Sequence, residues 1–325
     1  MDEPNNFWIY NNGITILTNG IHIDGNNISL SGFSIINGAQ TTGSLAEAAT
    51  QRPLRDAQVL FRAIKCNDTG LIDTVIRYNN TQNPIKAWEL RVIDPIQRRL
   101  QGQFSEIGIS YQLRRSVARR RANDVLFEKL APSLSAFYGD PFSAHRNRPE
   151  LFESERRYRQ LFSDESKVRN LLFIYRLGDA VAYAKSRLRD RIVSHGATHE
   201  EQGQYDLFRY GAFSYVLIHI CAEVLGILLN AERGDFKKYI TMTDEIFLDQ
   251  ERCIEVLGQL ALACLKLARS HLDGKNAYEV IRSQPGVEEL TRQGKTIVSQ
   301  VQGMVPETYV AITQHLRVEP PESAG

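Results

Sequence analysis

Four short blocks of amide, glycine and hydroxyl residues interrupt the apolar segments in the first hundred residues of this 325-residue chain. They are YNNG (residues 10–13), NGAQTT (37–42), NNTQNP (79–84) and DPIQ (94–97). Uncharged amides and hydroxyls are costly in a core, because each needs a hydrogen-bond partner once it is buried. These amide-rich blocks therefore predict short elements joined by ordered polar turns.

Between the blocks, the side chains alternate in the manner of strands. Residues 8–36 carry this alternation, with an NG turn signal at 19–20 and a DGNN turn at 24–27. We therefore predict a meander of short antiparallel strands, followed by a helix over 40–50 and a strand over 57–64. Two further helices are predicted over 71–78 and 93–104.

Helical periodicity dominates the chain beyond residue 116. Three segments are long enough to pack as a bundle: 168–192, 205–231 and 244–272. The predicted fold class is α+β, with an N-terminal mixed α/β head of short antiparallel strands followed by an all-α helical bundle. The predicted boundaries are 1–115 for the head, 116–317 for the helical domain and 318–325 for a disordered tail.

The overall charge selects no partner, because 39 basic residues balance 38 acidic ones. The four cysteines have no metal-site spacing, and we interpret the three that lie in apolar surroundings as small core residues in a reducing cytoplasm. No secretory signal is present, and no uncharged apolar run reaches the roughly 20 residues that span a bilayer. We expect a cytoplasmic protein that does not bind a membrane.

In order along the chain, the amide-rich blocks resemble the motifs of a known family. The matching segments are FWIYNNGITI, FSIINGAQTTGSL, RYNNTQNPIKAWELRVIDPIQRRL, YQLRR and LAPSLSAFYGDPFSAHRNRPELF. Together they resemble the AIPR proteins, which are named for abortive infection and phage resistance, over residues 7–165. The resemblance implies a role in bacterial antiviral defence. Typical members have a sizeable region before the tryptophan-containing motif, so we expect this chain to be a short form or a fragment.

The head is also faintly similar in layout to ParB-like and DGQHR-type DNA-modification-associated proteins. In those families, the turn that enters the helix carries an arginine that meets phosphate. Here Gln40, Thr41 and Thr42 stand where the comparable polar-basic pair would fall. This departure argues against nucleotide hydrolysis of the ParB kind.

The second block is a candidate anion site. Backbone N–H groups at a helix start attract anions, and the hydroxyls of Thr41 and Thr42 add donors beside Asn37, Gly38 and Gln40. The alternative is a strand-to-helix turn, with glycine at positive φ and threonine as an N-cap.

The third block offers amides that can pair with base edges. Asn79, Asn80, Gln82 and Asn83 place four amides in five positions, and an amide can bind adenine bidentately. The alternative is a solvated helix C-terminus, where asparagine adopts the left-handed conformation readily.

Arginines cluster directly after Tyr111, which can stack on bases. They are Arg114, Arg115, Arg119, Arg120 and Arg121. The alternative is a solvated helix face, but the nearby Asp124 and Glu128 are too few to neutralise five guanidinium groups. We therefore predict phosphate binding. Asn11, Asn12 and Gln97 complete the predicted nucleic-acid or nucleotide site, which requires the amide-rich blocks to converge on one face.

Two weaker sets of residues are candidates for catalysis. Asp94, with Glu89 or Asp73, supplies carboxylates for a metal-dependent nuclease, which would require Mg²⁺. Asp94 before proline is also a conventional N-cap. Arg189 and His195 have the spacing seen in HEPN ribonucleases.

The leading hypothesis is an antiphage factor whose head binds DNA, RNA or a nucleotide. Its helical domain would provide contacts for homo-oligomers or for a partner in the defence system. The alternatives are a metal-dependent or HEPN-like defence nuclease, and a protein-interaction subunit whose amides only brace the fold. We recognise no catalytic signature, such as a phosphate-binding Gly-Lys-Thr loop, and no cofactor beyond Mg²⁺ in the nuclease alternative.

Overall fold

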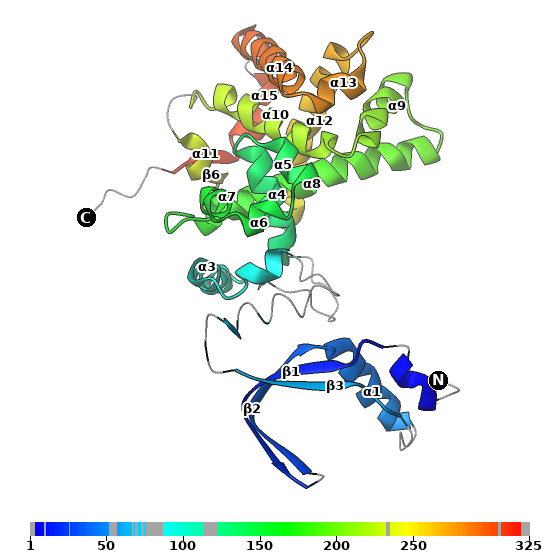
Figure 1. Ribbon diagram of the computed structural model, residues 1–325. Coiled ribbons are helices and arrows are strands. Elements are labelled where there is room, and N and C mark those ends of the chain that lie inside the picture. The colour runs from blue at the N-terminus through cyan, green and yellow to red at the C-terminus, as the bar shows by residue number, and fades with distance from the viewer. Residues whose placement is uncertain are drawn as a thin grey trace, which may run out of the picture. The chain divides into compact units, whose positions relative to one another are not determined.

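The computed structural model forms two compact units, residues 1–86 and 87–325, and each is described by itself (Figure 1). The residues that the structure describes are 4–9, 11–25, 27–51, 57–66, 68, 71–72, 75, 87–113, 123–231, 235–304 and 307–319. The sequence placed the boundary between the head and the helical domain after residue 115. The division at residue 86 instead assigns everything from the predicted 93–104 helix onward to the helical unit.

The first unit is built on a long, bent hairpin of β1 (Ile14–Asp24) and β2 (Asn27–Asn37), which pair antiparallel (Figure 1). Its closing turn holds Gly25 at a φ of 57°. The predicted turn at residues 19–20 is wrong, because β1 runs through it and Gly20 pairs with Ser31. The Thr18 hydroxyl bonds the carbonyls of Gly20 (3.0 Å) on its own strand and Ser31 (2.9 Å) on the neighbouring strand. These bonds join the two strands at the position of the predicted turn.

A helix carries the chain from β2 to a third strand. The short 3-10 helix η1 (Pro4–Ile9) precedes β1, and α1 (Ala39–Gln51) leads to β3 (Phe61–Lys65). The sheet order is β2-β1-β3, and β3 runs parallel to β1 because a crossover helix reverses the direction that the hairpin set. The helix and the strand were predicted; the parallel pairing was not.

The second unit begins with η2 (Ala87–Arg91) and α3 (Pro95–Glu106). Asp94 caps α3 by accepting a hydrogen bond from the Ile96 N–H (2.9 Å), with proline at the first helical position, which confirms the predicted cap. Helix α3 buries Leu100 and Phe104 fully, in the same apolar cluster as Phe127. This burial explains why α3 belongs to the helical unit.

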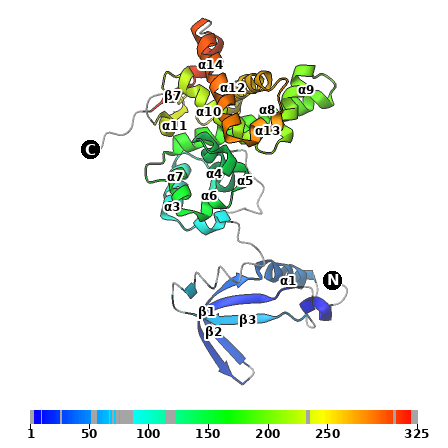
Figure 2. The same cartoon turned by 45° about the horizontal axis from the view of Figure 1, so that its top comes forward.

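Long helices form the core of this unit. The helix α8 (Val168–Val193) packs along α12 (Gln250–His271), and α10 (Phe213–Leu228) packs on both α14 (Gln284–Met304) and α4 (Phe127–Phe137) (Figures 1 and 2). The shorter helices are α5 (Pro141–Arg146), α6 (Glu150–Glu153), α7 (Glu155–Leu161), α9 (His199–Asp206), η3 (Leu207–Arg209), α11 (Phe236–Tyr239), α13 (Ala277–Arg282) and α15 (Glu307–Thr313).

The helix predicted over residues 205–231 is interrupted. It is divided among α9, η3 and α10, with a bend of 110° between residues 199–209 and 213–228. No single helix in the described part of the chain is long and apolar enough to cross a membrane. This bent pair passes such a test, by length and composition, only when its two parts are taken together.

Two short strand pairs complete the unit. The strands β4 (Tyr111–Gln112) and β5 (Val125–Leu126) pair parallel, and β6 (Ile240–Met242) pairs antiparallel with β7 (Leu316–Val318). Residue 318, the predicted start of the tail, thus lies in a strand, and residues 320–325 are outside the described residues. The α+β class, with a small N-terminal sheet and a helical C-terminal part, is confirmed.

The cap of α3 allows a direct test of what Asp94 does. Asp94→Ala should lower the free energy of unfolding by about 1 kcal/mol, whereas Asp94→Asn should change it little, because asparagine caps equally well. Urea denaturation followed by circular dichroism measures both. Equal destabilisation by the two variants would instead assign the effect to the carboxylate charge, which lies 3.7 Å from Arg159.

Candidate functional site

Two of the four amide-rich blocks meet at one end of the first unit's sheet. The Asn11 side chain accepts a hydrogen bond from the Gly13 N–H (2.8 Å) and donates to the Phe7 carbonyl. Gly38, at a φ of 90°, packs so closely on Gly13 that an added Cβ would lie 2.5 Å from its carbonyl oxygen. The first and second blocks are therefore neighbours, as predicted for part of the converging face.

The hydrogen bonds in this corner are mainly those of a turn. The Thr42 hydroxyl donates back to the Gly38 carbonyl (3.0 Å) instead of capping α1. Asn12 is exposed and Thr41 is half-buried, and neither side chain has a hydrogen bond to a described residue, whereas Asn37 is engaged. The structure thus accounts for Asn11 and Thr42 through local turn chemistry.

Gln97 and Tyr111 lie inside the second unit, which corrects the expectation that they face a binding groove. Gln97 is fully buried; its amide nitrogen donates to the Tyr158 hydroxyl (3.0 Å), and its oxygen accepts from the Tyr111 hydroxyl (2.6 Å). Burial raises the pKa of Tyr111 well above its ordinary value and that of Tyr158 to about 12. Both tyrosines therefore stay protonated, and the three side chains satisfy one another in the core.

Many of the predicted binding residues lie outside the described residues, and for them the predictions stand as made. They are Asn79, Asn80, Gln82, Asn83, Arg114, Arg115, Arg119, Arg120 and Arg121, together with the catalytic candidate Asp73 and the side chain of Gln40.

Two of the carboxylates predicted for metal-dependent catalysis are among the described residues, and they lie in different local environments. Asp94 caps α3, and Glu89 is exposed in η2. Within the described ranges, no group of three or more histidine, cysteine, aspartate or glutamate side chains is placed to hold a metal ion.

The Arg189–His195 pair lies across a helix end. His195 adopts a φ of 55° just beyond α8, and its N–H bonds the Ile192 carbonyl (3.1 Å) while the Gly196 N–H bonds the Arg191 carbonyl (2.9 Å). These two bonds form a Schellman motif, which ends the helix beside Gly196. Arg189 is exposed and bonds Ser186 and Asp190, both at 3.4 Å. His195 thus has the role of a helix-ending residue.

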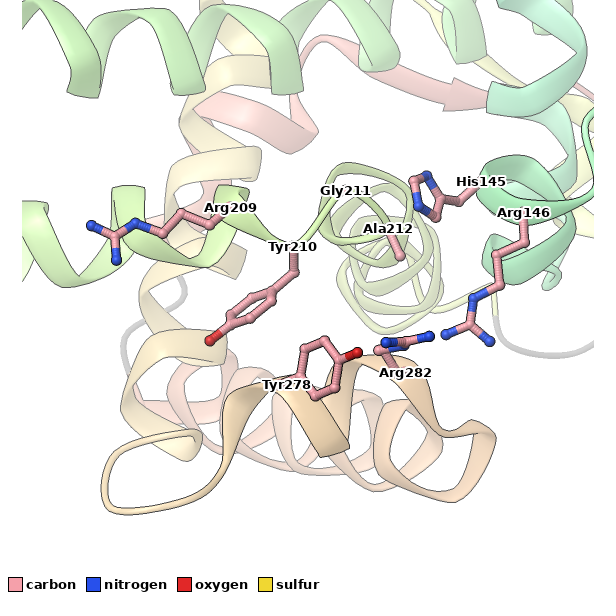
Figure 3. Close-up of a pocket in the computed structure, with 8 residues that line it drawn as sticks. All are labelled: His145, Arg146, Arg209, Tyr210, Gly211, Ala212, Tyr278 and Arg282. Carbon is pink, nitrogen blue, oxygen red and sulfur yellow. The ribbon is translucent and has the colours of Figure 1, made fainter.

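A pocket in the second unit gathers a different set of basic and aromatic side chains (Figure 3). Its volume is about 420 Å³. The lining residues come from the end of α5, the junction between η3 and α10, and α13. They are His145, Arg146, Arg209, Tyr210, Gly211, Ala212, Tyr278 and Arg282.

The arginines of this basic pocket differ in their partners. Arg209 is paired with Asp206 (3.1 Å) and points away from the others (Figure 3). Arg146 and Arg282 point toward each other, and neither forms an ion pair with any carboxylate among the described residues (Figure 3). Two uncompensated guanidinium groups on one pocket make it attractive to anions.

His145 lies beside these arginines. Burial in the pocket lowers its pKa, and the positive charges of Arg148, Arg146 and Arg282 lower it further. The His145 ring fits there because Gly211 lacks a side chain. A Cβ added to Gly211 would lie 2.6 Å from the Cε1 atom of His145.

Aromatic rings form the other side of the pocket. The centroids of Tyr210 and Tyr278 are 6.0 Å apart with an interplanar angle of 55°, and the Arg282 guanidinium lies 4.6 Å from the Tyr278 centroid. This stacking positions the Arg282 guanidinium, and both tyrosine rings lie next to it.

The start of α10 adds backbone donors. This 16-residue helix begins after Ala212, which makes no side-chain cap. The N–H groups of Gly211 and Ala212 have no acceptor among the described residues. The positive end of the helix dipole therefore reinforces the attraction for an anion at the pocket wall.

Sequence reasoning missed this site because its residues are far apart in the chain. Only His145 and Arg146 fall within a motif of the resembling segments, FSAHRNR, and they lie in the last turn of α5. No local signal marks Tyr278 or Arg282.

The electrostatics of the pocket predict the titration of His145. Its pKa should lie below 6.5, and Arg282→Gln should raise it by removing one positive charge. Because folding favours the neutral ring, this histidine should cost stability as the pH falls below 6.5. NMR titration, assigned with His145→Asn, measures the shift; a lower pKa in Arg282→Gln would contradict the proximity of the two groups.

Comparison with known protein families identifies a family model that covers most of the chain. The family model described as AIPR protein matches residues 1–304. No curated protein and no solved structure matches the chain. Because the match covers most of its length, the chain belongs to the AIPR family, and this membership supports a role in bacterial abortive infection and phage resistance.

Proposed function

We propose that this protein acts in antiphage defence by binding nucleic acid or nucleotides at the basic pocket of its second unit. The family supports the defence role. The pocket supports the ligand class, because phosphate groups carry the negative charge that its lining is suited to receive.

The observation that carries the proposal is the pair Arg146 and Arg282. Their guanidinium groups face one pocket, and no described carboxylate neutralises either (Figure 3). Arginine binds phosphate oxygens through two parallel hydrogen bonds, so two arginines can hold one phosphate group from two sides. The pKa of His145 is lowered first by burial and then by the positive charges of Arg148, Arg146 and Arg282, so this part of the protein carries positive potential.

The predicted amide-rich loops and arginine cluster extend the proposal. Asn79, Asn80, Gln82 and Asn83 are proposed to contact bases, and the arginines from 114 to 121 to contact phosphates. A binding role is favoured over a metal-dependent nuclease because Asp94 has a structural use as the cap of α3.

Removing the two arginines tests the proposal. Arg146→Ala combined with Arg282→Ala should weaken the binding of a labelled, 5′-phosphorylated single strand, and of a labelled nucleotide, by about tenfold or more. The slope of log affinity against log salt should fall by about 1.4 for the strand, as expected for two lost phosphate contacts. Fluorescence anisotropy on the full chain measures both quantities.

The matched control is Arg292→Ala, which removes an exposed arginine of α14 that pairs with Glu289 (2.6 Å) and does not line the pocket. Equal affinities for the double variant and the wild type would rule out the pocket as the binding site.

A second measurement separates binding from cleavage. Incubation of the nucleic acid with the protein and Mg²⁺ should leave the polymer intact. Cleavage that Asp94→Asn abolishes would overturn the binding proposal in favour of a nuclease, since this variant retains the cap of α3.

A further inference from the structure

We infer that the basic pocket takes a single nucleotide, with its phosphates on the arginines and its base on the tyrosines. This inference rests on the proposed function and narrows its ligand from any nucleic acid to one phosphorylated nucleoside.

The size of the pocket favours a small ligand. A volume of about 420 Å³ lies near the lower end of the range of about 300 to 1,000 Å³ that is typical of small-molecule sites. Proteins that bind several nucleotides of a strand use a longer basic groove that follows the backbone.

The basic groups next to the pocket do not continue as such a groove. Arg148 donates to the Ala144 carbonyl (2.9 Å) and to the Tyr215 hydroxyl. Arg209 is paired with Asp206 and points away from the pocket (Figure 3). Among the described residues that line the pocket, the guanidinium groups without an ion pair are therefore those of Arg146 and Arg282.

The phosphate end of the ligand is defined by three elements. Arg146 comes from the last turn of α5 and Arg282 from the last turn of α13. Their guanidinium groups point toward each other (Figure 3), in a pocket that His145 also lines. The N–H groups of Gly211 and Ala212 at the start of α10, which have no acceptor in the described part of the chain, offer further donors. A phosphate here is approached from separate directions, which favours a terminal group over a phosphate within a strand.

The base end is defined by Tyr210 and Tyr278. Tyr278 is 48% exposed, so a ligand in the pocket can reach its side chain. Because Arg282 lies 4.6 Å from the Tyr278 centroid, a phosphate bound to Arg282 has its nucleoside within reach of both rings. Stacking tolerates any base, so the geometry specifies a nucleotide without specifying its base.

A competition assay on the full chain tests this assignment. Fluorescent analogues of ATP and GTP serve as probes, and the competitors are the four nucleoside triphosphates, adenosine, pyrophosphate and an unphosphorylated single strand. The triphosphates should displace the probe about tenfold more strongly than pyrophosphate, because they add base stacking to the phosphate contacts. Adenosine and the unphosphorylated strand should displace it weakly.

Variants assign the two ends of the ligand. Tyr278→Leu should weaken nucleotide binding by about tenfold and leave pyrophosphate binding unchanged, as expected for loss of stacking alone. Arg146→Ala should weaken the binding of both the nucleotide and pyrophosphate. Arg292→Ala, which removes an exposed arginine outside the pocket, is the matched control and should change neither. Thermal melting checks that each variant is folded.

The outcomes separate this inference from the proposed function. The inference would be overturned if pyrophosphate displaced the probe as strongly as the nucleotides do, or if Tyr278→Leu left nucleotide binding unchanged. Either result would mean that the pocket binds anions without recognising a nucleoside. Stronger displacement by the unphosphorylated strand would also overturn it, while leaving nucleic-acid binding in place. Failure of every phosphate-bearing ligand to bind would overturn both proposals.

Discussion

The basic pocket depends on the bend between η3 and α10. A continuous helix through residues 205–231 would keep Tyr210 and Gly211 on the surface of a straight rod, with every interior N–H bonded to the preceding turn. The 110° break leaves the N–H groups of Gly211 and Ala212 without an acceptor among the described residues, and it brings Gly211 next to the His145 ring, which fits there because glycine has no side chain. The strongly apolar α10 stays buried behind this junction, so one local break serves both the core and the pocket.

Local patterns predicted elements well and failed where long-range pairing decides. The alternation in residues 8–36 predicted strands, which the structure forms as β1 and β2, and Asp94 before proline predicted the start of α3. The Asn19–Gly20 turn failed because the pairing of Gly20 with Ser31 extends the hairpin past a sequence that favours a turn. The parallel position of β3 was likewise set by the crossover through α1, which strand periodicity does not reveal.

The same distinction applies to the candidate site. Gln97 was predicted on the binding face as part of the fourth amide-rich block, yet it lies in the core, where the hydroxyls of Tyr111 and Tyr158 satisfy its amide. The contact between Gly13 and Gly38 could be anticipated, because each glycine lies in an amide-rich block next to a predicted strand. The basic pocket could not, because α5, α10 and α13 come together only through the packing of the whole unit.

The pocket also shows how charge can point to a ligand that the sequence does not reveal. Arg146, Arg148 and Arg282 all disfavour protonation of His145, so the free protein holds like charges together without compensation from a described carboxylate at Arg146 or Arg282. Such an arrangement costs stability on its own, although solvent exposure keeps the cost small. A bound phosphate reverses the sign of this interaction, and should raise the pKa of His145 as it binds. The arrangement is thus better suited to a phosphate-bearing ligand than to the stability of the free fold.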